Sequence, residues 1–134
     1  MASHRPKKSR AKVKAVRRPP EDFGERCLHM NCQQWLEKSG IWSRLLIFHV
    51  PNERRGGWGA IKHFQRMGVR PGVADYLAFP SRRGVAIEIK DKEGEQSDGQ
   101  EKFEAEWKAA GNVYVVVRSL EEFQGVVNAC ILFV

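Results

Sequence analysis

The stretch ADYLAFPSRRGVAIEIK, residues 74–90, contains two apolar runs separated by a polar turn. The runs at 74–79 and 85–90 have the composition of strands, and PSRRG between them has a common length for a hairpin loop. Successive side chains of a strand point to opposite faces, so Glu88 and Lys90 share one face of the second run. The stretch predicts a β-hairpin that carries an acid and a base in an apolar setting.

Upstream of this hairpin, the sequence predicts a helix, a strand and a second helix. Apolar residues recur at helical spacing through residue 38, with Asp22 as N-cap and Gly40 as the stop. The run RLLIFHV, 44–50, predicts a buried strand that ends at Pro51. The run AIKHFQRMG, 60–68, predicts a short helix.

Downstream, Ser97 and Gln100 have the spacing of a capping box, which predicts a helix that ends at Ala110. The almost continuously apolar run NVYVVV, 112–117, predicts an interior strand. A second capping box, Ser119 and Glu122, opens a helix that is expected to end near residue 128. The final residues CILFV are expected to form an edge strand or apolar packing.

This order of elements predicts the fold class. A helix that joins the strand at 85–90 to the strand at 112–117 implies a right-handed parallel crossover. Together with the antiparallel hairpin, the crossover predicts an α/β domain with a small mixed sheet flanked by helices. We expect this domain to span residues 21–134, preceded by a basic disordered tail at 1–20.

The formal net charge of +7 comes from the first twenty residues. They contain no acid and eight basic residues: Arg5, Lys7, Lys8, Arg10, Lys12, Lys14, Arg17 and Arg18. The rest of the chain has 15 basic and 16 acidic residues. Such a tail attracts polyanions, so we expect it to contact nucleic acid. The alternative is a solvated tail that only aids solubility.

The cysteines and the apolar runs restrict the class of protein. Three cysteines without a CxxC pair argue against a zinc ribbon or a disulfide framework, and reduced, partly buried thiols are expected. No run reaches the length of a membrane span, and no secretory apolar segment follows the basic start. We therefore expect a soluble, intracellular protein.

The hairpin suggests the chemistry of the site. Pairing of its strands can bring Asp75 near Glu88, and two carboxylates repel each other unless a positive charge lies between them. Mg²⁺ binds to one or two carboxylates and keeps several waters, and the ammonium group of Lys90 could position one of these waters. This arrangement suits phosphodiester hydrolysis. The alternative is a surface strand face with an ordinary ion pair.

Other polar residues have two interpretations each. Glu25 could join the metal site or serve in the capping box of the first helix, and the sequence favours neither. Glu53 could reach the same pocket or pair with a neighbouring arginine. Gln100 could cap its helix and also point at the site. His49 and Asn52 resemble fragments of a His-Asn nuclease motif, but a structural role is favoured because no second histidine has the required spacing.

The segments GVRPGVADYLAF and VAIEIKDKEGEQSDGQEKFEAEWKAAGNVYVVVRSLEEF together resemble the VRR-type nuclease (VRR-NUC) domain of the PD-(D/E)XK restriction-endonuclease-like superfamily. The segment HVPNE also resembles stand-alone phage-type members. The resemblance covers roughly residues 22–125. It rests on these motifs: Pro71-Gly72 with Asp75, Glu88-Ile89-Lys90, Ser97 to Gln100, and Gly111. The sequence departs from the family at Ala74, where a proline commonly precedes the aspartate.

The resemblance implies a restriction-endonuclease-like fold and a Mg²⁺- or Mn²⁺-dependent endonuclease. It implies Asp75, Glu88 and the backbone carbonyl of Ile89 as metal ligands, with Lys90 orienting the attacking water. Glu25 matches the acid of the first helix in the superfamily, and Gln100 matches the family's glutamine. The resemblance also implies a homodimer that cuts branched DNA such as Holliday junctions.

Two other functions remain open. The chain could be a non-catalytic DNA-binding module in which the tail carries the affinity and the acids hold a structural metal. It could also be a sequence-specific nuclease of the restriction kind, which ranks lower because 134 residues leave little room for a target-recognition domain.

Overall fold

The computed structural model describes residues 23–51 and 58–132. Their elements, in chain order, are α1 (Phe23–Ser39), the 3₁₀ turn η1 (Ile41–Ser43), β1 (Leu46–His49), α2 (Trp58–Arg66), β2 (Tyr76–Phe79), β3 (Val85–Ile89), α3 (Asp98–Ala109), β4 (Val113–Val117) and α4 (Leu120–Leu132). The predicted α/β class and the predicted order of helices and strands are confirmed.

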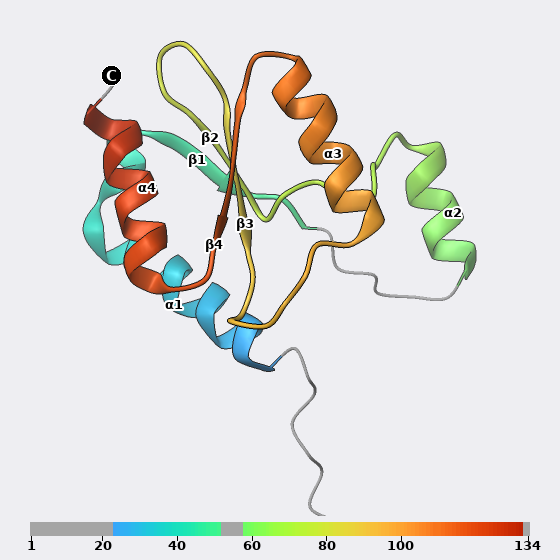
Figure 1. Ribbon diagram of the computed structural model, residues 1–134, viewed down its shortest axis with the longest axis horizontal. Coiled ribbons are helices and arrows are strands. Elements are labelled where there is room, and N and C mark those ends of the chain that lie inside the picture. The colour runs from blue at the N-terminus through green and yellow to red at the C-terminus, as the bar shows by residue number, and fades with distance from the viewer. Residues whose placement is uncertain (1–22, 52–57, 133–134) are drawn as a thin grey trace, which may run out of the picture.

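The four strands form one mixed sheet in the order β1-β2-β3-β4 (Figure 1). The pairs β1–β2 and β2–β3 are antiparallel, which confirms the predicted hairpin. The pair β3–β4 is parallel, as the crossover through α3 predicts. In the hairpin Tyr76 pairs with Ile87, and this register decides which residues meet at the open end of the two strands.

Helices cover both faces of the sheet (Figure 1). On one face α1 and α4 contact each other and pack on the apolar side chains of all four strands, around the fully buried Leu36, Tyr76, Ile87 and Phe123. On the other face α3 packs against β4. A smaller cluster there consists of Ala74, Ala86, Phe103 and Tyr114. Glu88 alternates with Ile87, so it belongs to this second face.

The strand β1 differs from its prediction. It lies at the edge of the sheet, with Ile47 buried but Leu46 63% and Phe48 44% exposed. The expectation of a buried strand at 44–50 is therefore wrong. The physical reason is that only α1 and α4 cover the sheet at β1, whereas α3 packs over β4 at the other side.

The strand β4 also differs, because it forms the other edge of the four-stranded sheet in the described part of the chain. Its continuous apolar character has another cause. Tyr114 packs in the cluster under α3, and Val117 packs in the core under α4, so both faces of this edge strand are covered. An apolar strand therefore need not be an interior strand.

The end of the chain is helical as far as it is described. α4 continues to Leu132 instead of stopping near residue 128, and Cys130 on it is buried in the main core. The expected edge strand at the C-terminus is thus wrong, and apolar packing by this segment is confirmed. All three cysteines are free, as expected, with Cys32 buried and Cys27 partly exposed.

No helix in the described ranges is long and apolar enough to cross a membrane. The predicted N-cap Asp22 and the basic tail at 1–20 lie outside the described residues.

Candidate metal centre

The hairpin register brings Asp75 next to Glu88. Pairing of β2 with β3 ends at Tyr76 and Ile87, so Asp75 precedes β2 at the level of Glu88 on the neighbouring strand. Beyond the last pair, the backbone N–H of Ile89 donates a hydrogen bond of 2.8 Å to Asp75 Oδ2. The predicted meeting of the two carboxylates is present, and a backbone contact fixes the aspartate.

The glycine turn that precedes Asp75 lies against the start of α3. Gly72 has φ +81°, and a Cβ atom at this position would lie 2.2 Å from the carbonyl carbon and oxygen of Gly99. The turn before Asp75 and the first turn of α3 can approach this closely because Gly72 has no side chain, whereas a Cβ at Gly99 would make only an ordinary contact of 3.7 Å with Gly72. This approach brings Gln100, the residue after Gly99, to the acids.

Gln100 serves two groups with its two amide atoms. Its Oε1 accepts from the backbone N–H of Ser97 at 2.8 Å, and the Ser97 hydroxyl accepts from the backbone N–H of Gln100, so the predicted capping box is present. Its Nε2 donates to Glu88 Oε1. The cap and the contact with the acids therefore coexist, as the sequence suggested they could.

Glu88 is the most buried charged side chain of the site, with 2% of its surface exposed. Burial, and then the nearby charge of Asp75, raise its pKa from 4.5 to about 8, although Lys90 acts in the opposite direction. Its Oε2 atom is buried without a hydrogen-bond partner, and it is the only such side-chain atom among the described residues. A buried carboxylate oxygen without a partner is costly unless a cation or a proton occupies the position beside it.

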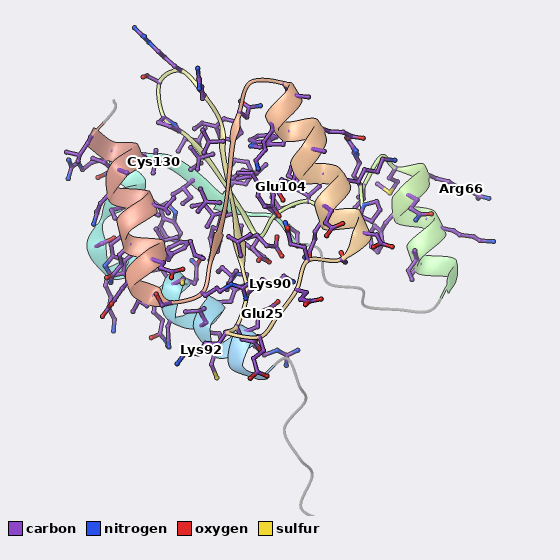
Figure 2. All side chains as sticks on the ribbon, in the orientation of Figure 1. Glu25, Arg66, Lys90, Lys92, Glu104 and Cys130 are labelled. Atoms are coloured by element: carbon purple, nitrogen blue, oxygen red, sulfur yellow. The ribbon has the colours of Figure 1, made fainter. Side chains whose placement is uncertain are left out.

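Lys90 lies between two acids. Its Nζ is 3.5 Å from Glu88 Oε1 and 3.9 Å from Glu25 Oε2, and the residue is only 8% exposed. Figure 2 shows Lys90 and Glu25 close together, where the end of β3 meets the start of α1. A long ammonium side chain held at both sides by carboxylates is a positioned hydrogen-bond donor to a water molecule in the site.

The helix α1 brings three polar residues to the sheet at intervals of one turn: Glu25, His29 and Gln33. Glu25 contacts Lys90, His29 Nδ1 lies 4.0 Å from Asp75 Oδ1, and Gln33 Oε1 accepts from the hydroxyl of Tyr76 at 2.7 Å. Glu25 is thus brought to the site, whereas its alternative capping role involves residues that the structure does not describe.

Sequence reasoning missed His29 and favoured a structural role for His49. Both imidazoles lie beside Asp75, and their rings meet edge to face at 4.5 Å. His29 had a usable signal, because it follows Glu25 by one helical turn. His49 had none in the local sequence, because it reaches the site only through the pairing of β1 with β2.

Several predicted site residues lie outside the described residues. They are Glu53, Asn52 and the eight basic residues of the tail, Arg5, Lys7, Lys8, Arg10, Lys12, Lys14, Arg17 and Arg18.

The donor set fits a hard divalent cation. Glu88 Oε2 is an unpartnered carboxylate oxygen, and Asp75 supplies a second carboxylate that a backbone contact already orients. Mg²⁺ is typically bound through one or two carboxylates with waters at its other positions. Asp75 and Glu88 could hold such an ion next to Lys90. Glu25 contacts Lys90, but the three carboxylates do not all lie within 4.8 Å of one another.

Comparison with known proteins gives structural neighbours only. No protein-family model and no curated protein sequence matches the chain. A solved structure described as "VRR_NUC domain protein" is similar with a TM-score of 0.67 and 21% identity, over 83% of this chain and 90% of that one. A second, described as "VRR_NUC domain", has a TM-score of 0.50 and 17% identity, over 78% of this chain and 95% of that one.

These neighbours define the class of fold. The chain has the α/β fold of VRR_NUC domains, with its helices and mixed sheet in the matching arrangement. This fold agrees with the resemblance to VRR-NUC domains found in the sequence motifs.

Proposed function

We propose that this protein is a metal-dependent, structure-specific DNA endonuclease of the PD-(D/E)XK type. It hydrolyses phosphodiester bonds, and its substrate is branched DNA such as a Holliday junction. The VRR_NUC fold and the two carboxylates beside a buried lysine support this proposal.

The observation that carries the proposal is the state of Glu88. This carboxyl group is buried, close to another carboxylate, and leaves one oxygen without a partner. A protein that needed only a stable core would gain by replacing it with an apolar residue. Burial of this carboxyl group costs stability, and binding of a Mg²⁺ or Mn²⁺ ion during function would explain why the residue is present.

Each residue then has a separate task. Asp75 and Glu88, with the backbone carbonyl of Ile89, would hold the ion, and Glu25 would complete the site from α1. The bound ion would supply charge neutralisation at the scissile phosphate and lower the pKa of water. Lys90 holds the attacking water and takes part in its proton transfer. Gln100 fixes the rotamer of Glu88 through its amide.

The partners follow from charge and symmetry. The eight basic residues of the tail bind DNA phosphates without reading sequence. One such site cuts one strand, so symmetric cutting of a junction requires a C2 dimer, the commonest closed assembly. Sedimentation of the full chain, alone and with a four-way junction, measures this assembly, and a monomer on the junction contradicts the dimer.

The alternative is a DNA-binding module without catalysis, in which the tail provides affinity and the acids hold a structural ion. The basic tail is the feature that favours it. Only the nuclease function predicts cleavage of DNA that depends on a divalent ion.

The experiment that tests the proposal is cleavage of labelled four-way junction, flap, single-stranded and linear duplex DNA with Mg²⁺, Mn²⁺ or EDTA. Asp75→Asn removes one acid of the site, and Glu121→Gln, an exposed acid on α4, is the matched control. We expect nicking with either ion, strongest on the junction, that is lost in EDTA and in Asp75→Asn. DNA binding without nicking under every condition contradicts the nuclease and supports the alternative.

A further inference from the structure

A second group of metal-binding side chains adjoins the acidic site. His29 of α1, His49 at the end of β1 and Asp75 before β2 each offer one ligand atom, and these atoms lie within 4.8 Å of one another. Within residues 23–51 and 58–132, this is the one group of three histidine, cysteine or acidic side chains with such spacing. His49 is exposed and the other two are partly exposed, so the group is open to solvent.

The hydrogen bonds around the group prepare two of its ligands. His49 Nδ1 lies 2.8 Å from the backbone carbonyl oxygen of Asp75. A carbonyl only accepts, so Nδ1 carries the proton and the lone pair of the neutral ring is on Nε2. Metal-binding histidines typically donate their second ring N–H in this way. Asp75 Oδ2 is held by the backbone N–H of Ile89, and Oδ1 faces His29 Nδ1 at 4.0 Å.

Packing fixes the third ligand. The ring of His29 lies 5.2 Å from the ring of Tyr76 and meets His49 edge to face at 4.5 Å. Tyr76 is fully buried and its hydroxyl is bound to Gln33, one turn further along α1. The imidazole is therefore held between a rigid aromatic residue and the second histidine.

We propose that His29, His49 and Asp75 form a second cation site that binds a divalent first-row transition ion, and that Asp75 is shared between this site and the position beside Glu88. Tetrahedral ligands of such an ion are about 3.4 Å apart, so the three ligand atoms must approach each other by up to about 1.5 Å. Rotation of the exposed His49 side chain and of Asp75 has to supply this approach.

The two positions differ in the ions that they prefer. The position beside Glu88 offers only oxygen ligands, which suit Mg²⁺, Mn²⁺ and Ca²⁺, whereas imidazole ligands favour Zn²⁺, Co²⁺ or Ni²⁺ over Mg²⁺. Two-metal phosphodiesterases use ions about 3.5–4 Å apart, and a carboxylate shared by both ions would suit such a pair. A role of the second ion in cleavage rests on the proposed nuclease function, but its binding does not.

The test is a Co²⁺ titration of the full-length protein in excess Mg²⁺, followed by visible d–d absorption. Mg²⁺ occupies the all-oxygen position, so the absorption reports the histidine site. His29→Asn and His49→Asn remove one ligand each. His63→Asn is the matched control, because His63 is an exposed imidazole on α2, and Glu88→Gln removes the first position only. His4 is present in every variant.

We expect one Co²⁺ ion with a nitrogen-ligand spectrum in the wild type, in His63→Asn and in Glu88→Gln. The affinity should fall at least tenfold in His29→Asn and in His49→Asn. The increase of Tm caused by Co²⁺ should disappear in the same two variants. His49 is exposed, so its variant keeps the test valid even if His29→Asn does not fold.

Equal Co²⁺ affinity in His49→Asn and in the wild type would overturn the proposal, and so would an equal loss in His63→Asn. Cleavage assays separate this outcome from the proposed function. If the protein binds Co²⁺ through the two histidines but cuts no DNA, the second site is supported and the nuclease function is contradicted. If the protein cuts DNA and His49→Asn binds Co²⁺ as tightly as the wild type does, the nuclease function is supported and the second site is contradicted.

Discussion

Gln100 donates a hydrogen bond to Glu88 through its amide nitrogen, while its amide oxygen accepts from the backbone N–H of Ser97. One side chain thus joins the cap of α3 to the most buried acid of the site. The start of α3 cannot shift without moving the donor away from Glu88. The stability of the helix start and the geometry of the site are therefore coupled.

Two substitutions separate these roles of Gln100. Ser97→Ala removes the cap hydroxyl, and we expect the free energy of unfolding to fall by about 1 kcal/mol with cleavage nearly unchanged. Gln100→Glu keeps an oxygen that accepts from Ser97 but places a carboxylate against Glu88. We expect stability in Mg²⁺ to change little and cleavage to fall about tenfold to a hundredfold, the effect of losing a charge-assisted hydrogen bond. Urea unfolding and junction cleavage measure the two effects. If both variants lose the same stability and both cleave DNA at the wild-type rate, Gln100 acts only as a cap.

Lys90 should be needed for cleavage and not for binding. Lys90→Met keeps the length of the side chain and removes the charge between Glu25 and Glu88. We expect the single-turnover rate to fall about 10²- to 10⁴-fold, the usual effect of losing a proton-transfer group. Affinities for DNA and Mg²⁺ should stay within a few-fold. The matched control is Lys108→Met, an exposed lysine paired with Glu104 on α3. A wild-type rate in Lys90→Met contradicts the proposed mechanism.

The sequence predicted the fold well where short-range signals decide it. The hairpin at 74–90 and the cap at Ser97 are local patterns, and the parallel crossover follows from the helix between two strands. The exposure of β1 and the edge position of β4 could not be predicted in this way. They depend on which part of the sheet each helix covers, and no local pattern contains that information.

The residues of the site also divide into those that local sequence patterns predict and those that depend on long-range packing. Asp75 and Glu88 were predicted to meet because a short hairpin connects their strands. His49, which is 26 positions before Asp75, joins them through the pairing of β1 with β2, and His29 joins them through the packing of α1 on the sheet. The contact of Gly72 with Gly99 is also a long-range feature, since the sequence marks a turn but not what the turn touches.

Gly72 should tolerate no side chain. Gly72→Ala adds a Cβ 2.2 Å from the backbone of Gly99, in addition to the cost of a positive φ. Gly68→Ala is the matched control, because Gly68 has φ +90° and nothing lies within 4 Å of its added Cβ. We expect Gly68→Ala to lower the free energy of unfolding by about 1 kcal/mol and Gly72→Ala by about 3 kcal/mol or more. Cleavage should be lost only in Gly72→Ala. Similar effects of both substitutions would mean that the close approach does not position Asp75.

The basic tail should carry the salt dependence of DNA binding. Deletion of residues 1–18 removes eight positive charges. Each lost phosphate contact lowers the slope of log K against log salt by about 0.9 for duplex DNA. We expect weaker binding with a flatter slope, and a variant with the eight residues changed to glutamine should behave in the same way. A slope that does not change on deletion assigns the tail another role.

Glu88 should make the metal-free protein less stable as the pH rises. Its pKa is about 8 in the folded protein and 4.5 ordinarily. Below pH 4.5 the group is protonated in both the folded and the unfolded protein, so it contributes no pH dependence there. Between pH 4.5 and 8 the unfolded protein loses this proton while the folded protein keeps it. The contribution of Glu88 to the free energy of unfolding therefore falls across this interval and is constant above it.

Glu88→Gln removes this dependence and keeps an acceptor for Gln100. Each unit of difference between the folded and unfolded pKa corresponds to about 1.4 kcal/mol. In EDTA at pH 9 we therefore expect the variant to be more stable than the wild type by a few kcal/mol, at most about 5. At pH 4 the two proteins should be equally stable. Urea unfolding from pH 4 to 9, with Glu121→Gln as control, measures the difference. A constant difference between the two proteins at every pH would show that Glu88 is already ionised in the folded protein without metal.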